Sequence, residues 1–248
     1  MQPHGETFTI RVSEIDANRQ LTPYALVNLF QEVAWNHADA LGVSVYRLLD
    51  EGLTWVLYRM KLAVSRWPQH RDPIRLETLP TGIEKRFFYR DFYVYDAEGT
   101  CIAHATSTWL VMDIRKRQLV SVPAFIQDTF TPFAGVTALP KANDRLPAPT
   151  EPVTQVSFQI RGQDLDVNGH VNNSVYFQWL LESMPSGTQQ PVLQSLDVLF
   201  RAESNREDEI IAQVSEAQPG EYAHRLLNQH GKELVQARSV WSAAEQTD

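Results

Sequence analysis

The chain repeats part of its own sequence at an offset of 150 residues. Identical residue types recur in the same order in both halves: Phe8 and Phe158, Ile10 and Ile160, Arg11 and Arg161, Asp16 and Asp166, Asn18 and Asn168, Glu32 and Glu182. The repeats that build solenoids and propellers are much shorter, about 20–50 residues. The long offset therefore predicts a duplicated domain, so that one architecture must suit both halves of the chain.

Hydrophobic periodicity gives the same order of elements in each half. Thr22 is a good N-cap, Pro23 suits a first helical turn, and Gly42 suits a helix end, which predicts a long helix over 22–42. A second helix is expected over 172–184. Alternating apolar residues predict strands at 8–12, 53–67, 74–80, 85–95 and 101–113 and, in the second half, at 155–161, 192–201, 209–215, 222–229 and 235–242. Each half is thus α+β, a helix wrapped by an antiparallel sheet.

A stretch with little periodicity separates the halves. Residues 131–150 contain four prolines, which is typical of a linker. We therefore expect an N-terminal domain over 1–130, a linker over 131–150 and a C-terminal domain over 151–248.

Composition narrows the class of protein. A net charge of −8 argues against a nucleic-acid partner. The single cysteine excludes an internal disulfide and indicates a reducing compartment. No apolar run approaches the length of a membrane span. Residues 1–6 lack the pattern of a signal peptide, so we expect a cytoplasmic protein.

The segment 164–173 (DLDVNGHVNN) concentrates polar side chains that can move protons or stabilise an oxyanion. Caps for the following helix would explain Asn172 and Asn173 but not His170. If the lead-in is extended, Asp166, Asn168 and His170 face the same way. The first half has Gln20 where the second has His170, so the second copy is predicted to carry the chemistry.

The chain resembles the acyl-acyl carrier protein thioesterases of plants and bacteria over about residues 6–245. The longest match is 164–185 (DLDVNGHVNNSVYFQWLLESMP), and shorter matches follow in order at 30–32 (FQE), 35–37 (WNH), 53–56 (LTWV), 58–60 (YRM) and 109–112 (WLVM). The resemblance implies two tandem hotdog domains. It also implies hydrolysis of fatty acyl-acyl carrier protein to free fatty acid, without a cofactor or metal. The acyl chain would lie in the N-terminal domain, and the C-terminal domain would supply the catalytic groups.

The family's catalytic positions fall on Asp166, Asn168 and His170. A further acid position falls on Glu203, in an element that here reads FRAES over 200–204. Many plant members carry a cysteine where this chain has Ser204, so a thiolate nucleophile is absent from that position. Cys101 lies in the other half.

Thioester hydrolysis needs an activated nucleophile, a stabilised oxyanion and a protonated leaving group. Asp166 or Glu203 could activate water, or attack the carbonyl directly to form an anhydride. His170 could orient a carboxylate or protonate the leaving sulfur, and Asn168 could donate hydrogen bonds. Backbone N–H groups at the start of the helix are further candidate donors. Residue types alone leave water attack and covalent attack both open.

Other residues are weaker candidates. Glu182 has a twin in Glu32, which favours a structural role, and His37 fits a helix face. The remaining histidines show no metal-ligand spacing. The basic residues 115–117 suit a solvated turn or a docking surface for the acidic carrier protein, as do Lys85, Arg86 and Arg90.

Competing functions remain open at this point. The donor could be acyl-coenzyme A, the protein could bind acyl groups without cleaving them, or it could be a hydratase acting on enoyl thioesters. Chain-length preference depends on packing that the sequence does not specify. Both a monomer and a homodimer are compatible with the sequence.

Overall fold

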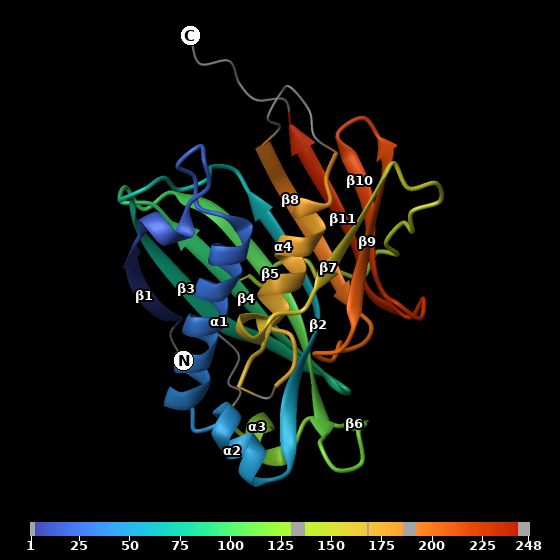
Figure 1. The fold of residues 1–248 in the computed structure, drawn as a ribbon. Helices are drawn as coiled ribbons and strands as arrows, with labels where there is room; N and C mark the ends of the chain where they lie inside the picture. Colours follow the sequence, from blue (N-terminus) through green and yellow to red (C-terminus); the bar gives the residue numbers. More distant parts are fainter. Residues whose placement is uncertain (1–2, 130–136, 168, 186–191, 243–248) are drawn as a thin grey trace. The chain divides into compact units, whose positions relative to one another are not determined.

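The computed structural model describes residues 3–129, 137–167, 169–185 and 192–242. The chain divides into two compact units. Unit 1 comprises Met1–Met60 and Ser65–Ala142, and unit 2 comprises Lys61–Val64 and Asn143–Asp248. Each unit combines a helix with an antiparallel sheet, as the periodicity predicts (Figure 1).

Unit 1 contains the longer helix. Its helices are α1 (Pro23–Ala40), α2 (Val45–Asp50) and α3 (Ala124–Gln127), with a short 3₁₀ helix at Val12–Glu14. Its strands are β1 (His4–Thr9), β2 (Leu53–Val64, whose last four residues are grouped with unit 2), β3 (Pro73–Glu84), β4 (Phe87–Tyr95), β5 (Cys101–Asp113) and β6 (Gln118–Val120). Neighbouring strands follow the order β1-β3-β4-β5-β2, and β6 pairs with β5.

Unit 2 repeats this arrangement. It contains a 3₁₀ helix at Gly162–Asp164, the helix α4 (Asn173–Glu182), and the strands β7 (Thr154–Gln159), β8 (Val192–Phe200), β9 (Glu209–Gln218), β10 (Glu221–Asn228) and β11 (Glu233–Ser242). Their order is β7-β9-β10-β11-β8, which is the order of the corresponding strands in unit 1. The duplication predicted from the 150-residue offset is therefore confirmed.

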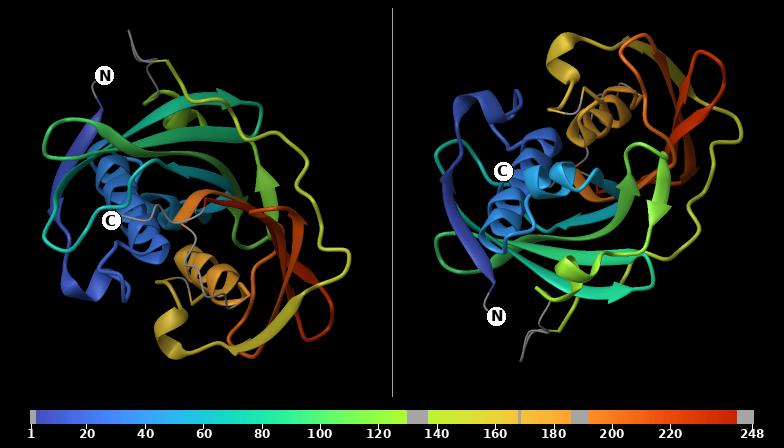
Figure 2. Two further views of the ribbon diagram at one scale, coloured as in Figure 1. Left: turned by 90° about the horizontal axis from the view of Figure 1, so that it is seen from above. Right: turned by 90° about the horizontal axis from the view of Figure 1, so that it is seen from below.

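Each long helix lies against the concave face of its own sheet (Figure 2). The Thr22 hydroxyl accepts a hydrogen bond from Ala25 N at 3.2 Å, so the predicted cap starts α1. The buried face of α1 includes Phe30, whose ring stacks on Phe92 of β4 at 4.7 Å. Burying these apolar faces stabilises the helix and the sheet together, since neither could leave its inner side in water.

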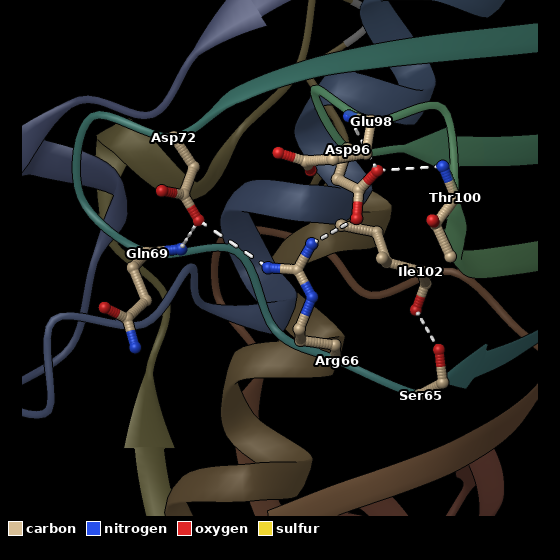
Figure 3. Close-up of polar contacts among 8 residues, drawn as sticks. All are labelled: Ser65, Arg66, Gln69, Asp72, Asp96, Glu98, Thr100 and Ile102. Atoms are coloured by element: carbon tan, nitrogen blue, oxygen red, sulfur yellow. Dashed lines mark hydrogen bonds and ion pairs between the residues drawn. The ribbon is translucent and has the colours of Figure 1, made fainter.

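The turn between β4 and β5 shows how local chemistry fixes a hairpin (Figure 3). The Asp96 carboxylate accepts hydrogen bonds from Glu98 N at 3.1 Å and Thr100 N at 2.8 Å. Gly99 follows with φ +83°, a conformation that favours glycine. Arg66 pairs with the same carboxylate at 2.5 Å and reaches Asp72 at 3.9 Å. One guanidinium thus ties this turn to the loop before β3.

Unit 1 contains three short elements that the hydrophobic periodicity of the sequence does not predict. α2, α3 and β6 have too few residues for periodicity to reveal them, and packing around a satellite cluster that includes Leu48, Val111 and Ile126 stabilises them. The first strand lies at His4–Thr9 rather than 8–12, because a 3₁₀ helix starts after Arg11, whose backbone N–H donates to the Glu14 carboxylate at 2.8 Å. Within the described ranges, no helix is both long and apolar enough to cross a membrane.

Candidate active site

The polar segment before α4 folds into a closed loop. Leu165 and Val171 pair as an antiparallel bridge, and Asp166 N donates to His170 O at 2.7 Å. Gly169 adopts φ +75° and donates its N–H to Asp166 O at 3.0 Å. The lead-in is therefore not extended, because local hydrogen bonds and a left-handed glycine close the chain into a turn.

Asp166 organises this loop through its side chain. Its Oδ1 accepts a hydrogen bond from His170 N at 3.1 Å. In unit 1, Asp16 Oδ1 accepts from Gln20 N at 3.0 Å and from Asn18 N at 2.9 Å. In both copies the carboxylate thus accepts hydrogen bonds from backbone N–H groups of its own loop. The two loops differ at three positions, one of which is Gln20 in unit 1 and His170 in unit 2.

The structure brings His170 and Glu203 together across 33 residues of sequence. His170 Nε2 lies 3.8 Å from Glu203 Oε2, and the two side chains are 34% and 31% exposed. This separation is too long for a direct hydrogen bond. It suits attraction between a protonated imidazole and a carboxylate, and partial exposure leaves the pair open to water.

The remaining predicted residue, Asn168, lies outside the described residues. The structure therefore places three of the four predicted site residues, Asp166, His170 and Glu203, in unit 2. They come from the loop before α4 and from the segment 201–208 between β8 and β9, which has no helix or strand.

The start of α4 is less available as an oxyanion site than expected. Asn172 Oδ1 accepts hydrogen bonds from both Ser174 N and Ser174 Oγ at 3.0 Å. Val175 N donates to Asn172 O, also at 3.0 Å. These two backbone donors serve the helix cap, so they are not free to bind a substrate oxygen.

Ser204 is not placed as a nucleophile. It is fully buried, and its Oγ lies 2.5 Å from Tyr176 Oη. Tyr176 also accepts from Ser204 N at 3.2 Å. Sequence reasoning missed Tyr176, because an aromatic residue on a buried helix face has no signature that distinguishes it from ordinary core.

Other candidates occupy structural positions. Glu182 ends α4, about 13 Å along the helix from Asn173, and accepts from Gln178 Nε2 at 2.6 Å. Cys101 belongs to unit 1, and burial raises the pKa of its thiol, which disfavours the thiolate. In the described part of the chain, no cluster of histidine, cysteine or carboxylate side chains could hold a metal ion.

Arg90 is not available to a partner, contrary to the docking prediction. It is 5% exposed, and its Nη1 lies 3.1 Å from His37 Nδ1 and 3.1 Å from Thr78 Oγ1. Burial, with Arg90 and His4 nearby, lowers the pKa of His37 to about 4, so this imidazole is a neutral acceptor for the guanidinium. Lys85 and Arg86, at the turn before β4, and residues 115–117, before β6, are exposed.

A helix wrapped by an antiparallel sheet, present twice in tandem, defines a double-hotdog protein. Residues 2–130 match the acyl-ACP thioesterase N-terminal domain, and residues 148–243 match the acyl-ACP thioesterase C-terminal domain. The chain therefore belongs to the acyl-ACP thioesterase family.

Similar proteins agree with this assignment. The chain is 29% identical over 265 residues to a chloroplastic palmitoyl-acyl carrier protein thioesterase of Arabidopsis thaliana, covering 98% of this chain and 64% of the relative. It is 30% identical over 254 residues to a chloroplastic acyl-[acyl-carrier-protein] hydrolase of Cuphea viscosissima, covering 95% of this chain and 61% of the relative. The chain thus spans less than two thirds of the length of these curated relatives.

Solved structures extend the comparison. The 12:0-ACP thioesterase from Umbellularia californica superposes with a TM-score of 0.83 at 26% identity, covering 97% of each chain. An acyl-ACP thioesterase from Bacteroides thetaiotaomicron superposes with a TM-score of 0.84 at 21% identity, covering 97% of this chain and 98% of that one. The second likeness shows the fold alone.

Proposed function

We propose that the protein hydrolyses the thioester of fatty acyl-acyl carrier protein, releases free fatty acid and so terminates chain elongation in fatty acid biosynthesis. The observation that carries the proposal is the 3.8 Å approach of His170 to Glu203, next to the loop that Asp166 closes. Membership of the acyl-ACP thioesterase family gives this pair its substrate class.

The site residues share out the proton transfers and hydrogen bonds that the reaction needs. Glu203 or Asp166 takes the proton of the attacking water, and His170 supplies a proton to the departing sulfur. Asn168 donates its amide hydrogens to the water or to the oxyanion. Water adds to the carbonyl carbon, the carbon–sulfur bond breaks, and the products are a carboxylic acid and a thiol.

Direct attack by a carboxylate is the alternative route, through a mixed anhydride that water then opens. Hydrolysis in ¹⁸O-labelled water followed by peptide mass spectrometry detects the anhydride route when water opens the anhydride at the enzyme's carboxyl carbon. Water attack at the thioester leaves the enzyme unlabelled. Opening of an anhydride at the enzyme's carbonyl carbon adds label to Asp166 or Glu203.

The proposal divides the work between the two domains. The N-terminal domain, 1–130, binds the acyl chain, the segment 131–150 links the domains, and the C-terminal domain, 151–248, supplies the catalytic groups. Support comes from the contrast between Gln20 and His170 at matching positions of two loops, each closed by an aspartate.

The proposed partner is an acidic acyl carrier protein. Because the chain itself carries a net charge of −8, docking requires a local basic surface. The exposed cations at 85–86 and 115–117 are assigned this role. The proposed compartment is the cytoplasm, where the single cysteine, Cys101, would stay reduced. Light scattering would establish whether the enzyme acts as a monomer or as a homodimer.

A thiol-release assay tests the proposed function. The enzyme is supplied with carrier-protein donors of graded acyl length, and with coenzyme A donors of the same lengths. Thiol release and free fatty acid should appear together, faster from the carrier-protein donors. Equal rates from coenzyme A would reassign the donor, and tight acyl binding without thiol release would indicate a non-catalytic acyl-binding protein. Enoyl donors that gain water and keep their thioester would indicate a hydratase.

A further inference from the structure

A buried tyrosine of α4 contacts the chain immediately beside Glu203. Tyr176 is 3% exposed and Ser204 is fully buried. Tyr176 Oη accepts a hydrogen bond from Ser204 N at 3.2 Å and lies 2.5 Å from Ser204 Oγ. The tyrosine hydroxyl therefore holds both the backbone and the side chain of the residue that follows Glu203.

The ring that carries this hydroxyl is itself fixed. Tyr176 makes edge-on contacts with Trp179 at 5.4 Å and with Phe200 at 5.7 Å between ring centroids. Burial raises the pKa of Tyr176 to about 12, so the hydroxyl keeps its proton at physiological pH. A protonated Oη can accept from the Ser204 N–H and donate to Ser204 Oγ at the same time.

Glu203 needs such an anchor because the segment 201–208 has neither helix nor strand. On its N-terminal side, Arg201 N and Ala202 N both donate to Leu234 O, at 2.8 and 3.2 Å. On its C-terminal side, the Tyr176 contacts secure Ser204. Glu203 is thus held between two attachment points.

The helix that supplies Tyr176 also receives the His170 loop. His170 precedes Tyr176 by six residues, and Tyr176 is the fourth residue of α4. The start of α4 therefore follows directly on the His170 loop. Through Tyr176, it also makes hydrogen bonds to the segment that contains Glu203. His170 and Glu203, whose Nε2 and Oε2 atoms lie 3.8 Å apart, are thus both connected to the start of α4.

We infer that Tyr176 is a positioning residue that holds Glu203 opposite His170 during catalysis. The inference rests on the proposed function, because it assigns Glu203 and His170 to thioester hydrolysis. Misplacing a reacting group by about 1 Å can cost up to about 10²-fold in rate. Tyr176 thus supports turnover without touching the substrate.

Replacing Tyr176 by phenylalanine tests the inference, because the ring and its packing stay while both hydrogen bonds to Ser204 are lost. We expect kcat for an acyl-carrier-protein donor to fall about 10- to 100-fold, with KM changed less than about 2-fold. Ser204→Ala should cost less than about 5-fold, because the backbone N–H of residue 204 still donates to Tyr176 Oη.

A double-mutant cycle separates positioning from general stability. In a Glu203→Gln background, Tyr176→Phe should lower the single-turnover rate by less than about 2-fold, because the carboxylate it positions is already gone. Ser183→Ala is the matched control. It removes another buried hydroxyl of this helix region, which donates to Leu180 O at 2.8 Å, and should lower thermal stability without changing kcat.

Each outcome supports or overturns the inference. An active wild type whose kcat is unchanged by Tyr176→Phe overturns it, as does an equal loss in both backgrounds. If Tyr176→Phe does not fold, the same cycle with Ser204→Ala decides. A small loss of kcat that disappears in Glu203→Gln supports the inference, whereas no loss, or a loss that persists in Glu203→Gln, overturns it. A wild type that releases no thiol refutes the proposed function and the inference with it.

Discussion

The sharpest stability prediction concerns His224, a fully buried histidine on β10 of unit 2. Its Nε2 lies 2.7 Å from Ser239 Oγ, which also accepts from Trp241 Nε1 at 2.8 Å. An indole can only donate, so the Ser239 hydroxyl proton is free to point at Nε2, and the neutral ring then carries its own proton on Nδ1. Within the described residues, Nδ1 has no hydrogen-bond partner.

This environment disfavours the charged ring. Burial lowers the pKa of His224 from 6.5 to about 3. In the unfolded chain the imidazole takes up a proton below pH 6.5, whereas in the folded protein it stays neutral until about pH 3. The contribution of His224 to the free energy of unfolding is therefore fully present above pH 6.5 and is lost progressively as the pH falls toward 3. The slope is about 1.4 kcal/mol per pH unit, which gives about 2 kcal/mol at pH 5.

Urea unfolding at pH 7.5, 6, 5 and 4.5 measures this loss for the wild type and His224→Gln. Glutamine places an amide oxygen near Ser239 but does not titrate. At pH 7.5 the substitution should lower the free energy of unfolding by about 1–3 kcal/mol. This difference from the wild type should shrink by about 2 kcal/mol at pH 5, because only the wild type loses stability through protonation of residue 224. The exposed His230→Gln is the control for removing an imidazole. Parallel stability curves for the wild type and His224→Gln would refute the reasoning.

Three further predictions use the two copies and the surface. Asp166→Asn keeps an oxygen that can accept from His170 N but loses the charge, so turnover should fall about 10²–10⁴-fold, whereas Asp16→Asn should leave single-turnover rates near those of the wild type. Equal losses would make the first copy catalytic. In Gly169→Ala the new Cβ would have no atom within 4 Å, so the free energy of unfolding should fall only by the backbone cost of φ +75°, about 1–2 kcal/mol. A much larger fall would contradict this. Charge reversal at 115–117 should raise KM for carrier-protein donors and weaken the salt dependence of that KM, because it removes the local attraction to the acidic partner. Salt screens charges more than about 8 Å apart, so a compact basic surface decides the encounter. Hydrolysis of a small acyl thioester should be unchanged. Unchanged KM for every donor would place docking elsewhere.

The sequence by itself determined the duplicated α+β architecture. Elements of this length repeat a hydrophobic period, and their caps are local, so Thr22 and Asn172 start helices as expected. The repeat even extends to side chains, since Trp109 donates to Ser107 and Trp241 to Ser239, both at 2.8 Å. Local signals of this kind need no knowledge of distant contacts.

The short elements escaped prediction for the opposite reason. α2 and α3 contain six and four residues, too few to show a period, and their stability comes from burial in the satellite cluster. The alternation of residue types in the lead-in to α4 did not decide between a strand and a turn, because both can show it. The Asp166 carboxylate and the left-handed Gly169 decided in favour of a turn.

The candidate site likewise contains residues that the sequence could group and contacts that only the tertiary structure makes. Asp166 and His170 are close in sequence and could be grouped by spacing, and their tandem copy at Asp16 and Gln20 showed which half to examine. Only the tertiary structure brought Glu203 to 3.8 Å from His170, buried Ser204 against Tyr176 and removed Arg90 from the surface. Such contacts arise when separate strands and helices pack, and because they depend on the whole fold, no local pattern of residues specifies them.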